Sequence, residues 1–293
     1  MFRHKSIIGV IILLLASIVL AVLWFVNSHA GQPLSTAAFN ALTHPDVPTQ
    51  NQWQFAVIGD TEDVRPVNEQ MIADMKNRPL AFAVHVGDIS SHGDEDALQQ
   101  VKTLFAPLPF PTYYLPGNND LVYDETLEIK TPAPYQRIID ERLYYSIDYR
   151  QAHIVLLDNS YRRFGFPDEE LAWLKEDLDK NTQPLTFLFF HRPLNVPGQQ
   201  LFGDDETPNS REQNTKFEEL IAGYNISHIF NGHIHIPFSY TLNEIPVTVT
   251  GGGGALPQDI LGGADAALFH YYVVTVNESQ NTASYSLERI DFE

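Results

Sequence analysis

Polar side chains that bind divalent metal ions recur along the chain, each time directly after a short apolar run. They are Asp60 after residues 54–58, Asp88 after 80–86, Asn118 after 112–115, His191 after 185–190, and His233 with His235 after 228–230. Carboxylate, amide and imidazole groups together suit Mn²⁺, iron and Zn²⁺. Two such ions about 3.5–4 Å apart can activate water and clamp a phosphoryl group. The pattern therefore indicates hydrolytic chemistry at a two-metal site.

The apolar runs alternate with segments of helical spacing, which predicts strands separated by helices. Helical spacing occurs in residues 67–75, 97–105, 171–178 and 216–224. This alternation is typical of a layered α/β fold with a mostly parallel sheet, and the β-rich stretch from residue 238 onward indicates a second sheet. Ligands of such sheets bind beyond the carboxyl ends of the strands. The predicted elements would therefore bring the polar residues together.

Each motif taken alone has a plainer explanation. A Gly-Asp pair after a strand usually caps a helix, and Pro-Gly-Asn is usually a turn. The two histidines of Gly-His-Ile-His face the same way on a strand, but they could be structural. Only the ordered set at successive strand ends is specific. His85, His92 and His153 lie outside the motifs, and we expect them to be structural or exposed.

The ordered motifs resemble those of the calcineurin-like metallophosphoesterase family. They are Gly59-Asp60, Gly87-Asp88, Gly117-Asn118-Asn119-Asp120, His191 and Gly232-His233-Ile234-His235. The resemblance covers residues 53–270, and the four glycines at 251–254 are similar to a glycine-rich turn often found late in that family. It implies an α/β fold, a four-layer αββα sandwich with two mixed β-sheets. It also implies hydrolysis of phosphomonoesters, phosphodiesters or pyrophosphates by a metal-bridging hydroxide at a dinuclear site.

Carried over by position, the resemblance assigns Asp88 to both metal ions. The first ion would also bind Asp60 and His235, and the second would also bind Asn118, His191 and His233. The same transfer places five residues in the catalytic group, with Asp120 in a supporting, loop-bracing role: Asp88, Asn118, Asn119, Asp120 and His191. Arg192 follows His191 and could hold a phosphate oxygen bidentately. A surface charge is the alternative for Arg192.

Two positions depart from the family pattern. Glu62 stands where the first motif usually has a histidine, and Asn119 stands where the third motif has one. Glu62 can still supply an oxygen ligand, and a carboxylate favours harder ions. We therefore expect two divalent ions, Mn²⁺ or Fe²⁺/Fe³⁺, with Zn²⁺ as the alternative. Asn119 can hydrogen-bond a phosphate oxygen and so bind substrate, but it cannot donate a proton as an acid.

The amino-acid composition limits the classes of molecule that the protein is expected to bind. The 293-residue chain has a formal net charge of −19, and such a surface repels nucleic-acid phosphates. It has no cysteine, which excludes disulfides and thiolate metal ligands.

The expected substrate is a phosphorylated small molecule or a lipid-linked phosphate. An enzyme acting on a phosphate ester or anhydride is the favoured interpretation. The alternative is a degenerate binding or interaction module that has lost turnover.

The N-terminus predicts attachment to a membrane. Residues 1–6 carry three basic side chains, residues 7–26 are almost wholly apolar, and no Lys or Arg follows until Arg65. Twenty apolar residues span a bilayer, and the charge asymmetry places residues 1–6 in the cytoplasm. Residues 27–52 would form a stalk, and residues 53–293 an extracytoplasmic catalytic domain. Secretion after signal cleavage is the alternative, because Ser28-His29-Ala30 resembles a cleavage site.

Overall fold

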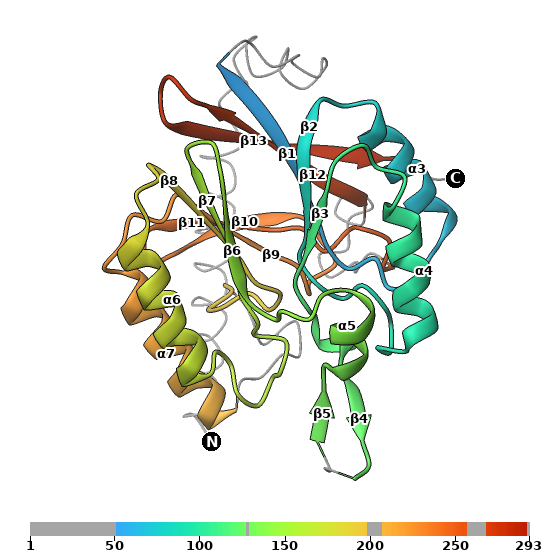
Figure 1. Ribbon diagram of the computed structural model, residues 1–293, viewed down its shortest axis with the longest axis horizontal. Helices are drawn as coiled ribbons and strands as arrows, with labels where there is room; N and C mark the ends of the chain where they lie inside the picture. Colours follow the sequence, from blue (N-terminus) through green and yellow to red (C-terminus); the bar gives the residue numbers. More distant parts are fainter. Residues whose placement is uncertain (1–50, 127–128, 198–206, 257–267, 292–293) are drawn as a thin grey trace, which may run out of the picture. The chain divides into compact units, whose positions relative to one another are not determined.

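Two β-sheets, stacked face to face, organise the part of the chain that the computed structural model describes (Figure 1). That part comprises residues 51–126, 129–197, 207–256 and 268–291. The first sheet has the strand order β13-β12-β1-β2-β3, and the second has the order β10-β11-β9-β8-β7-β6.

The strands of the first sheet are β1 (Gln52–Ile58), β2 (Leu80–His85), β3 (Thr112–Tyr114), β12 (Phe269–Asn277) and β13 (Thr282–Ile290). Those of the second are β6 (Tyr145–Tyr149), β7 (Ala152–Leu156), β8 (Leu185–Phe189), β9 (His228–Asn231), β10 (Phe238–Leu242) and β11 (Ile245–Val249).

Both sheets are mixed, with parallel strands beside antiparallel ones. In the first sheet β1, β2 and β3 are parallel, while β12 and β13 run antiparallel. In the second, β7, β8, β9 and β11 are parallel, and β6 and β10 are antiparallel edges. The parallel strands of each sheet therefore end at one edge, where the predicted metal ligands follow them.

Apolar side chains pack between the two sheets and between each sheet and the helices that cover it. Phe55, Phe82, Phe187 and Phe230 belong to the core between the sheets, where they are almost fully buried. Burial of such rings contributes roughly 1.5–3 kcal/mol each relative to exposure. This central layer holds the two sheets, and hence their carboxyl edges, against each other.

Helices cover the outer face of each sheet. α3 (Pro66–Lys76) and α4 (Glu95–Phe105) pack on the first, and α6 (Asp168–Lys180) and α7 (Pro208–Ile221) pack on the second. In α3 the buried residues Val67, Met71 and Met75 recur every four positions, which aligns them on one helix face. The result is the expected four-layer αββα sandwich, with α3 and α4 on one side of Figure 1 and α6 and α7 on the other.

Two elements lie at the carboxyl edge and were not predicted. The short helix α5 (Ala133–Ile138) follows a two-stranded hairpin made of β4 (Val122–Asp124) and β5 (Ile129–Thr131). In Figure 1 this hairpin projects from the body below α5.

The C-terminal strands and α7 differ from the sequence prediction. The β-rich stretch after residue 238 is shared between the sheets, because β12 pairs with β1 and returns the chain to the first sheet. α7 begins at Pro208 instead of residue 216, since the Thr207 side chain accepts a hydrogen bond from the Ser210 backbone N–H and caps the helix.

The predicted N-terminal segments, residues 1–6, 7–26 and most of 27–52, lie outside the described residues. The residues from Pro48 to Glu293 form one compact unit. Within the part of the chain that the structure describes, no helix is long and apolar enough to cross a bilayer.

His85, His92 and His153, which lie outside the motifs, occupy the kinds of position expected for them. His85 is buried, with Nε2 2.7 Å from the Thr61 hydroxyl. His153 lies between Asp148 and Asp177 at 2.7 and 2.8 Å, and His92 is exposed.

Candidate metal centre

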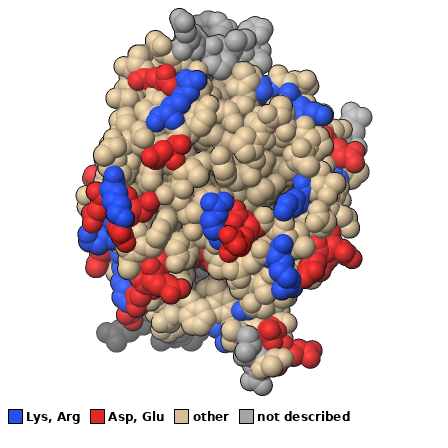
Figure 2. Space-filling model, in the orientation of Figure 1, with Lys and Arg blue, Asp and Glu red and all other residues tan. Residues whose placement is uncertain are grey.

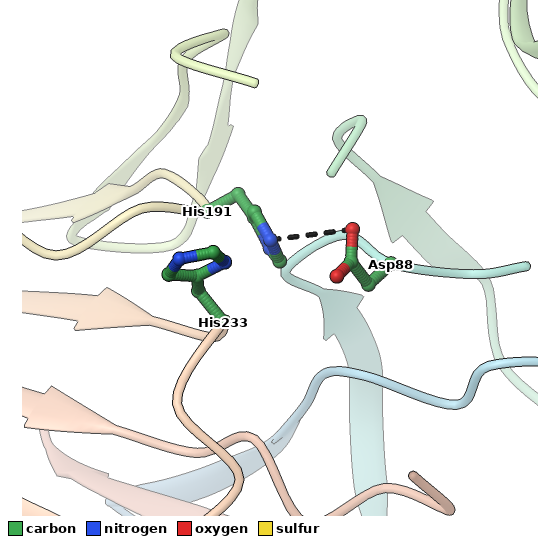
Figure 3. A group of neighbouring side chains, drawn as sticks. All are labelled: Asp88, His191 and His233. Carbon is green, nitrogen blue, oxygen red and sulfur yellow. Dashed lines mark ion pairs between the residues drawn. The ribbon is translucent and has the colours of Figure 1, made fainter. Parts of the chain in front are cut away.

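The carboxyl ends of β1, β2, β8 and β9 bring the predicted ligands together from both sheets. Figure 3 shows Asp88, which follows β2, beside His191 after β8 and His233 after β9. One ligand atom from each of these three side chains lies within 4.8 Å of the others. Three residues more than forty positions apart in sequence therefore offer a carboxylate and two imidazoles to a single point.

Four of the predicted ligands lie in loops where the backbone adopts a rare conformation. Asp60, Glu62, Asp88 and His233 all have positive φ, at 59°, 45°, 51° and 71°. For residues other than glycine this region costs energy and persists only where the surroundings enforce it. Here the loops enforce it on each other, because the Asp60 N–H donates to the Gly87 carbonyl at 2.9 Å.

Glycines allow the loops to approach so closely. A Cβ on Gly117 would lie 2.0 Å from the Asp88 backbone nitrogen, and one on Gly232 would lie 2.4 Å from Asp60 Oδ2. The glycine turn after β11 serves the same purpose: the Gly253 N–H donates to the Gly59 carbonyl at 2.8 Å. The glycines of the motifs therefore leave space for the carboxylates.

His191 and its neighbours form the second predicted metal position. Its Nδ1–H donates to the Val86 carbonyl at 2.9 Å, which fixes the ring and leaves Nε2 pointing at two oxygens. Nε2 lies 3.1 Å from Asn118 Oδ1 and 3.3 Å from Asp88 Oδ1. The His233 ring lies beside that of His191, with centroids 5.1 Å apart.

His235, Asp60 and Glu62 form the first predicted position with the same geometry. His235 Nδ1–H donates to the Leu256 carbonyl at 3.1 Å. Its Nε2 lies 3.4 Å from Asp60 Oδ1 and 3.6 Å from Glu62 Oε1. Each of the two imidazoles is thus oriented by a different backbone carbonyl, and each presents Nε2 to a pair of oxygens.

The donor set fits divalent cations. Burial lowers the pKa of both His191 and His235, but the nearby Asp88 and Asp60 carboxylates outweigh it and raise each pKa to about 9. The surroundings of His191 and His235 therefore favour a positive charge. A metal ion bound between each ring and its neighbouring oxygens would supply that charge. Burial, with the charges of His191 and Arg192, lowers the pKa of His233 to about 3 and leaves the neutral imidazole that a metal requires.

Asn119 links the two positions. Its backbone N–H donates to Asp88 Oδ1 at 2.8 Å, and its side-chain amide donates to Asp88 Oδ2 at 2.9 Å and to Glu62 Oε1 at 3.2 Å. The amide therefore holds one carboxylate from each loop. Glu62 itself points toward the centre, where burial raises its pKa.

Asp120 is buried, and its carboxylate binds backbone N–H groups of two neighbouring loops. Its carboxylate accepts hydrogen bonds from the backbone N–H groups of Gly117, Ile89 and Ser90 at 2.8, 3.1 and 2.9 Å. These bonds tie the loop after β3 to the loop after β2, as the bracing role requires. Burial and the charge of Asp88 raise the Asp120 pKa to about 7.

Two residues next to the centre were not identified from the sequence. Asn159 exchanges hydrogen bonds with the Arg192 backbone, donating to its carbonyl at 2.7 Å and accepting from its N–H at 2.9 Å. Asn159 follows β7, so the strand-end rule could have found it. Lys130 Nζ donates to the Asn118 carbonyl at 3.4 Å, but it lies on the unpredicted strand β5.

Arg192 reaches the second metal position. Its Nη1 donates to Asn118 Oδ1 at 3.3 Å, beside His191 Nε2. The guanidinium thus lies at the edge of the ligand set instead of extending into solvent.

Comparison with known proteins gives one family and several relatives. A model of the calcineurin-like phosphoesterase family matches residues 54–237. A probable glycerophosphodiester phosphodiesterase from Arcobacter nitrofigilis is 25% identical over 60% of this chain and 64% of its own. A probable cyclic nucleotide phosphodiesterase from Fibrobacter succinogenes is 23% identical over 59% and 64%. The chain thus spans less than two thirds of the length of these relatives.

Solved structures share the fold. Purple acid phosphatase PPD1 from yellow lupin superposes with a TM-score of 0.61 at 16% identity, covering 85% of this chain and 55% of that one. GAP50, the anchor in the inner membrane complex of Plasmodium, superposes with a TM-score of 0.57 at 14% identity, covering 83% and 90%.

Proposed function

The chain belongs to the calcineurin-like phosphoesterase family, and we propose that it hydrolyses phosphate esters or anhydrides at a dinuclear metal centre. One observation carries the proposal: two imidazoles, each fixed by a backbone carbonyl, present Nε2 to paired oxygens. His191 faces Asp88 and Asn118, and His235 faces Asp60 and Glu62. Buried polar atoms arranged in this way are costly unless a cation lies between them.

Seven side chains would hold the metal ions. The first ion would bind Asp60, Glu62 and His235, the second would bind Asn118, His191 and His233, and Asp88 would contact both. When bound, a pair of divalent ions supplies a hydroxide nucleophile and neutralises charge on the phosphoryl group. The carboxylate of Glu62 in place of an imidazole favours Mn²⁺ or iron over Zn²⁺.

The remaining polar groups would position the substrate. Arg192 Nη1 contacts Asn118 Oδ1, so the guanidinium can hold a phosphate oxygen without leaving its place. The Asn119 side-chain amide donates to both Asp88 and Glu62, and it would hold these two carboxylates in position. The substrate class proposed from this site is a phosphorylated small molecule, including a lipid-linked phosphate.

The direct test is hydrolysis by the metal-loaded protein. We expect turnover of bis-p-nitrophenyl phosphate, p-nitrophenyl phosphate or pyrophosphate with Mn²⁺, its loss with a chelator and its return on re-addition of Mn²⁺. A protein that binds metal but turns over none of these would instead be a binding module.

Asn119 predicts a preference for good leaving groups. A departing alkoxide needs a proton, and general acid assistance contributes roughly 10²–10⁴ in rate, which an amide cannot supply. The rate should therefore fall steeply as leaving-group pKa rises, and the slope should be shallower in Asn119→His. Asn119→Ala is the control, because it removes the contacts to Asp88 and Glu62 without adding an acid. Equal slopes in all three proteins would show that position 119 plays no part in leaving-group departure.

We also propose that residues 7–26 anchor the protein, with the catalytic domain outside the cytoplasm. The apolar length and the preceding basic residues support this. The full chain should stay with membranes after an alkaline wash, and its domain should be cut by protease added to intact cells or spheroplasts. A mature protein that begins near residue 31 and fractionates with soluble proteins would favour secretion after cleavage.

A further inference from the structure

Arg65 places a positive charge beside the first predicted metal position. The chain has 18 basic residues against 37 acidic ones, and on the face drawn in Figure 2 the basic side chains are interspersed with acidic ones. Arg65 instead faces a predicted metal ligand, with its Nη2 3.9 Å from Glu62 Oε2. A positive charge at this place repels a metal ion and by itself lowers the affinity for it. The guanidinium therefore has to contribute something other than its charge.

The guanidinium of Arg65 joins two loops of the first position. Its Nη1 donates to the Gly254 carbonyl at 2.9 Å, while Nη2 faces Glu62. Gly254 belongs to the glycine turn after β11, two residues before Leu256, whose carbonyl accepts a hydrogen bond from His235 Nδ1 at 3.1 Å. One planar group thus contacts the predicted ligand Glu62 on one side and the turn that orients His235 on the other.

The start of α3 holds the backbone of Arg65 in place. α3 begins directly after Arg65, and the Arg65 N–H donates to Asn68 Oδ1 at 2.6 Å. Asn68 is buried, and its Nδ2 donates to the Gly253 carbonyl at 2.5 Å. A Cβ on Gly254 would lie 2.1 Å from Asn68 Nδ2, so the glycine turn packs directly against the helix. The backbone of Arg65 is therefore fixed next to the same turn that its guanidinium reaches.

The glycine turn supports the first position and leaves the second to other contacts. The Ala255 N–H donates to the Asp60 carbonyl at 2.8 Å, so the turn also holds the loop of a third predicted ligand of the first ion. In the second position, His191 is oriented by the Val86 carbonyl at the end of β2. Loss of the Arg65 contacts should therefore affect one metal ion and spare the other.

We propose that Arg65 is a positioning residue for the first metal ion, because its guanidinium fork holds Glu62 at a fixed separation from the turn that orients His235. A planar guanidinium can serve two groups at once in a rigid geometry, whereas an ammonium group on a flexible stem cannot. Glu62 Oε1 is thereby kept 3.6 Å from His235 Nε2. This inference rests on the proposed function, since it concerns a metal ion of that centre.

Two variants of Arg65 separate position from charge. Arg65→Met removes the charge and both contacts, and Arg65→Lys keeps the charge without the planar fork. Metal-free full chain would be titrated with Mn²⁺, and free Mn²⁺ would be measured by electron paramagnetic resonance. We expect both variants to bind one ion about tenfold more weakly and the other as in the wild type, since groups that orient metal ligands contribute about 10–100-fold in affinity. Arg65→Lys should be at least as weak as Arg65→Met, because it retains the repelling charge.

Two outcomes would show that Arg65 acts through its charge alone. Tighter binding of the ion in Arg65→Met than in the wild type is one, and wild-type binding in Arg65→Lys is the other. Either result would overturn the positioning role. Arg65→Met would also be combined with His235→Ala, which already lacks a predicted ligand of the first ion. The added substitution should then change nothing, and a further loss of the remaining ion would overturn the assignment to one position.

Arg78→Met is the matched control. Arg78 lies just beyond the other end of α3, where its guanidinium contacts Asp74 at 3.0 Å and Glu288 at 2.6 Å. Loss of these contacts should lower the melting temperature and leave the affinity for both Mn²⁺ ions unchanged. Equal weakening of one ion in Arg78→Met and Arg65→Met would attribute the effect to general stability of the fold and overturn the inference.

The Mn²⁺ titration separates the role of Arg65 from the proposed function. Two bound ions without turnover of any ester, with one ion weakened in Arg65→Met, would overturn the hydrolase proposal and leave the role of Arg65 standing. Turnover with equal Mn²⁺ affinity in the wild type and Arg65→Met would overturn the role of Arg65 alone. Fewer than two bound ions in the wild type would overturn both.

Discussion

Asp88→Ala is expected to abolish hydrolysis, with a loss of kcat/KM on the order of 10³-fold or more, about 4 kcal/mol of transition-state stabilisation. Asp88 is buried, lies 3.3 Å from His191 Nε2 and shares the Asn119 amide with Glu62. Its removal would take a proposed ligand from both ions and leave two Asn119 donors without their acceptor. Loss of a group that merely orients a metal ligand already costs about 10–100-fold in affinity.

The measurement for Asp88→Ala is metal content together with turnover. We expect the occupancy of both ions to fall at a Mn²⁺ concentration that saturates the wild type. Asp148→Asn is the control, because it removes a carboxylate at the opposite end of the second sheet, beside His153. Retention of two tightly bound ions by Asp88→Ala would contradict the bridging assignment.

His235→Ala is expected to empty one metal position and spare the other. His235 Nε2 contacts Asp60 and Glu62, whereas His191 Nε2 contacts Asp88 and Asn118. Loss of the His235 imidazole should therefore lower the affinity for one ion by more than about 10²-fold, since a direct ligand contributes more than the groups that orient it. Turnover should fall on a similar scale, because hydrolysis at a two-metal site requires both ions.

Added imidazole distinguishes this effect from general damage to the fold. It should restore part of the metal binding and turnover of His235→Ala by filling the space of the missing ring. His92→Ala removes an exposed histidine outside the motifs and should match the wild type. Two equally tight ions in His235→Ala would show that His235 is not a ligand.

The proximity of the predicted ligands could be predicted because parallel strands end at a common edge. Asp60, Asp88 and His191 each follow a short apolar run, and these runs form the mostly buried strands β1, β2 and β8. The glycines of the motifs marked the close approach of the loops, which the contacts of Gly117 and Gly232 explain. The orientation of each imidazole could not be predicted, because Val86 and Leu256 contribute only backbone carbonyls.

Other elements left weaker signals in the sequence. β4 and β5 have three residues each, too few for an alternating pattern, so the hairpin that carries Lys130 was not found. The first turns of α7 bear Asn209, Arg211 and Glu212, and its apolar spacing starts only later. The pairing of β12 with β1 joins residues more than two hundred positions apart, and no local pattern specifies such a contact.

Metal titration of the purified full chain tests the central claim most directly. Metal-free protein would be dialysed against increasing Mn²⁺, with bound metal measured by elemental analysis and ester hydrolysis measured on the same samples. We expect two ions per chain, with hydrolysis rising as the second position fills. Fewer than two ions at saturation, or full hydrolysis in the presence of a chelator, would contradict a dinuclear hydrolytic centre formed by these residues.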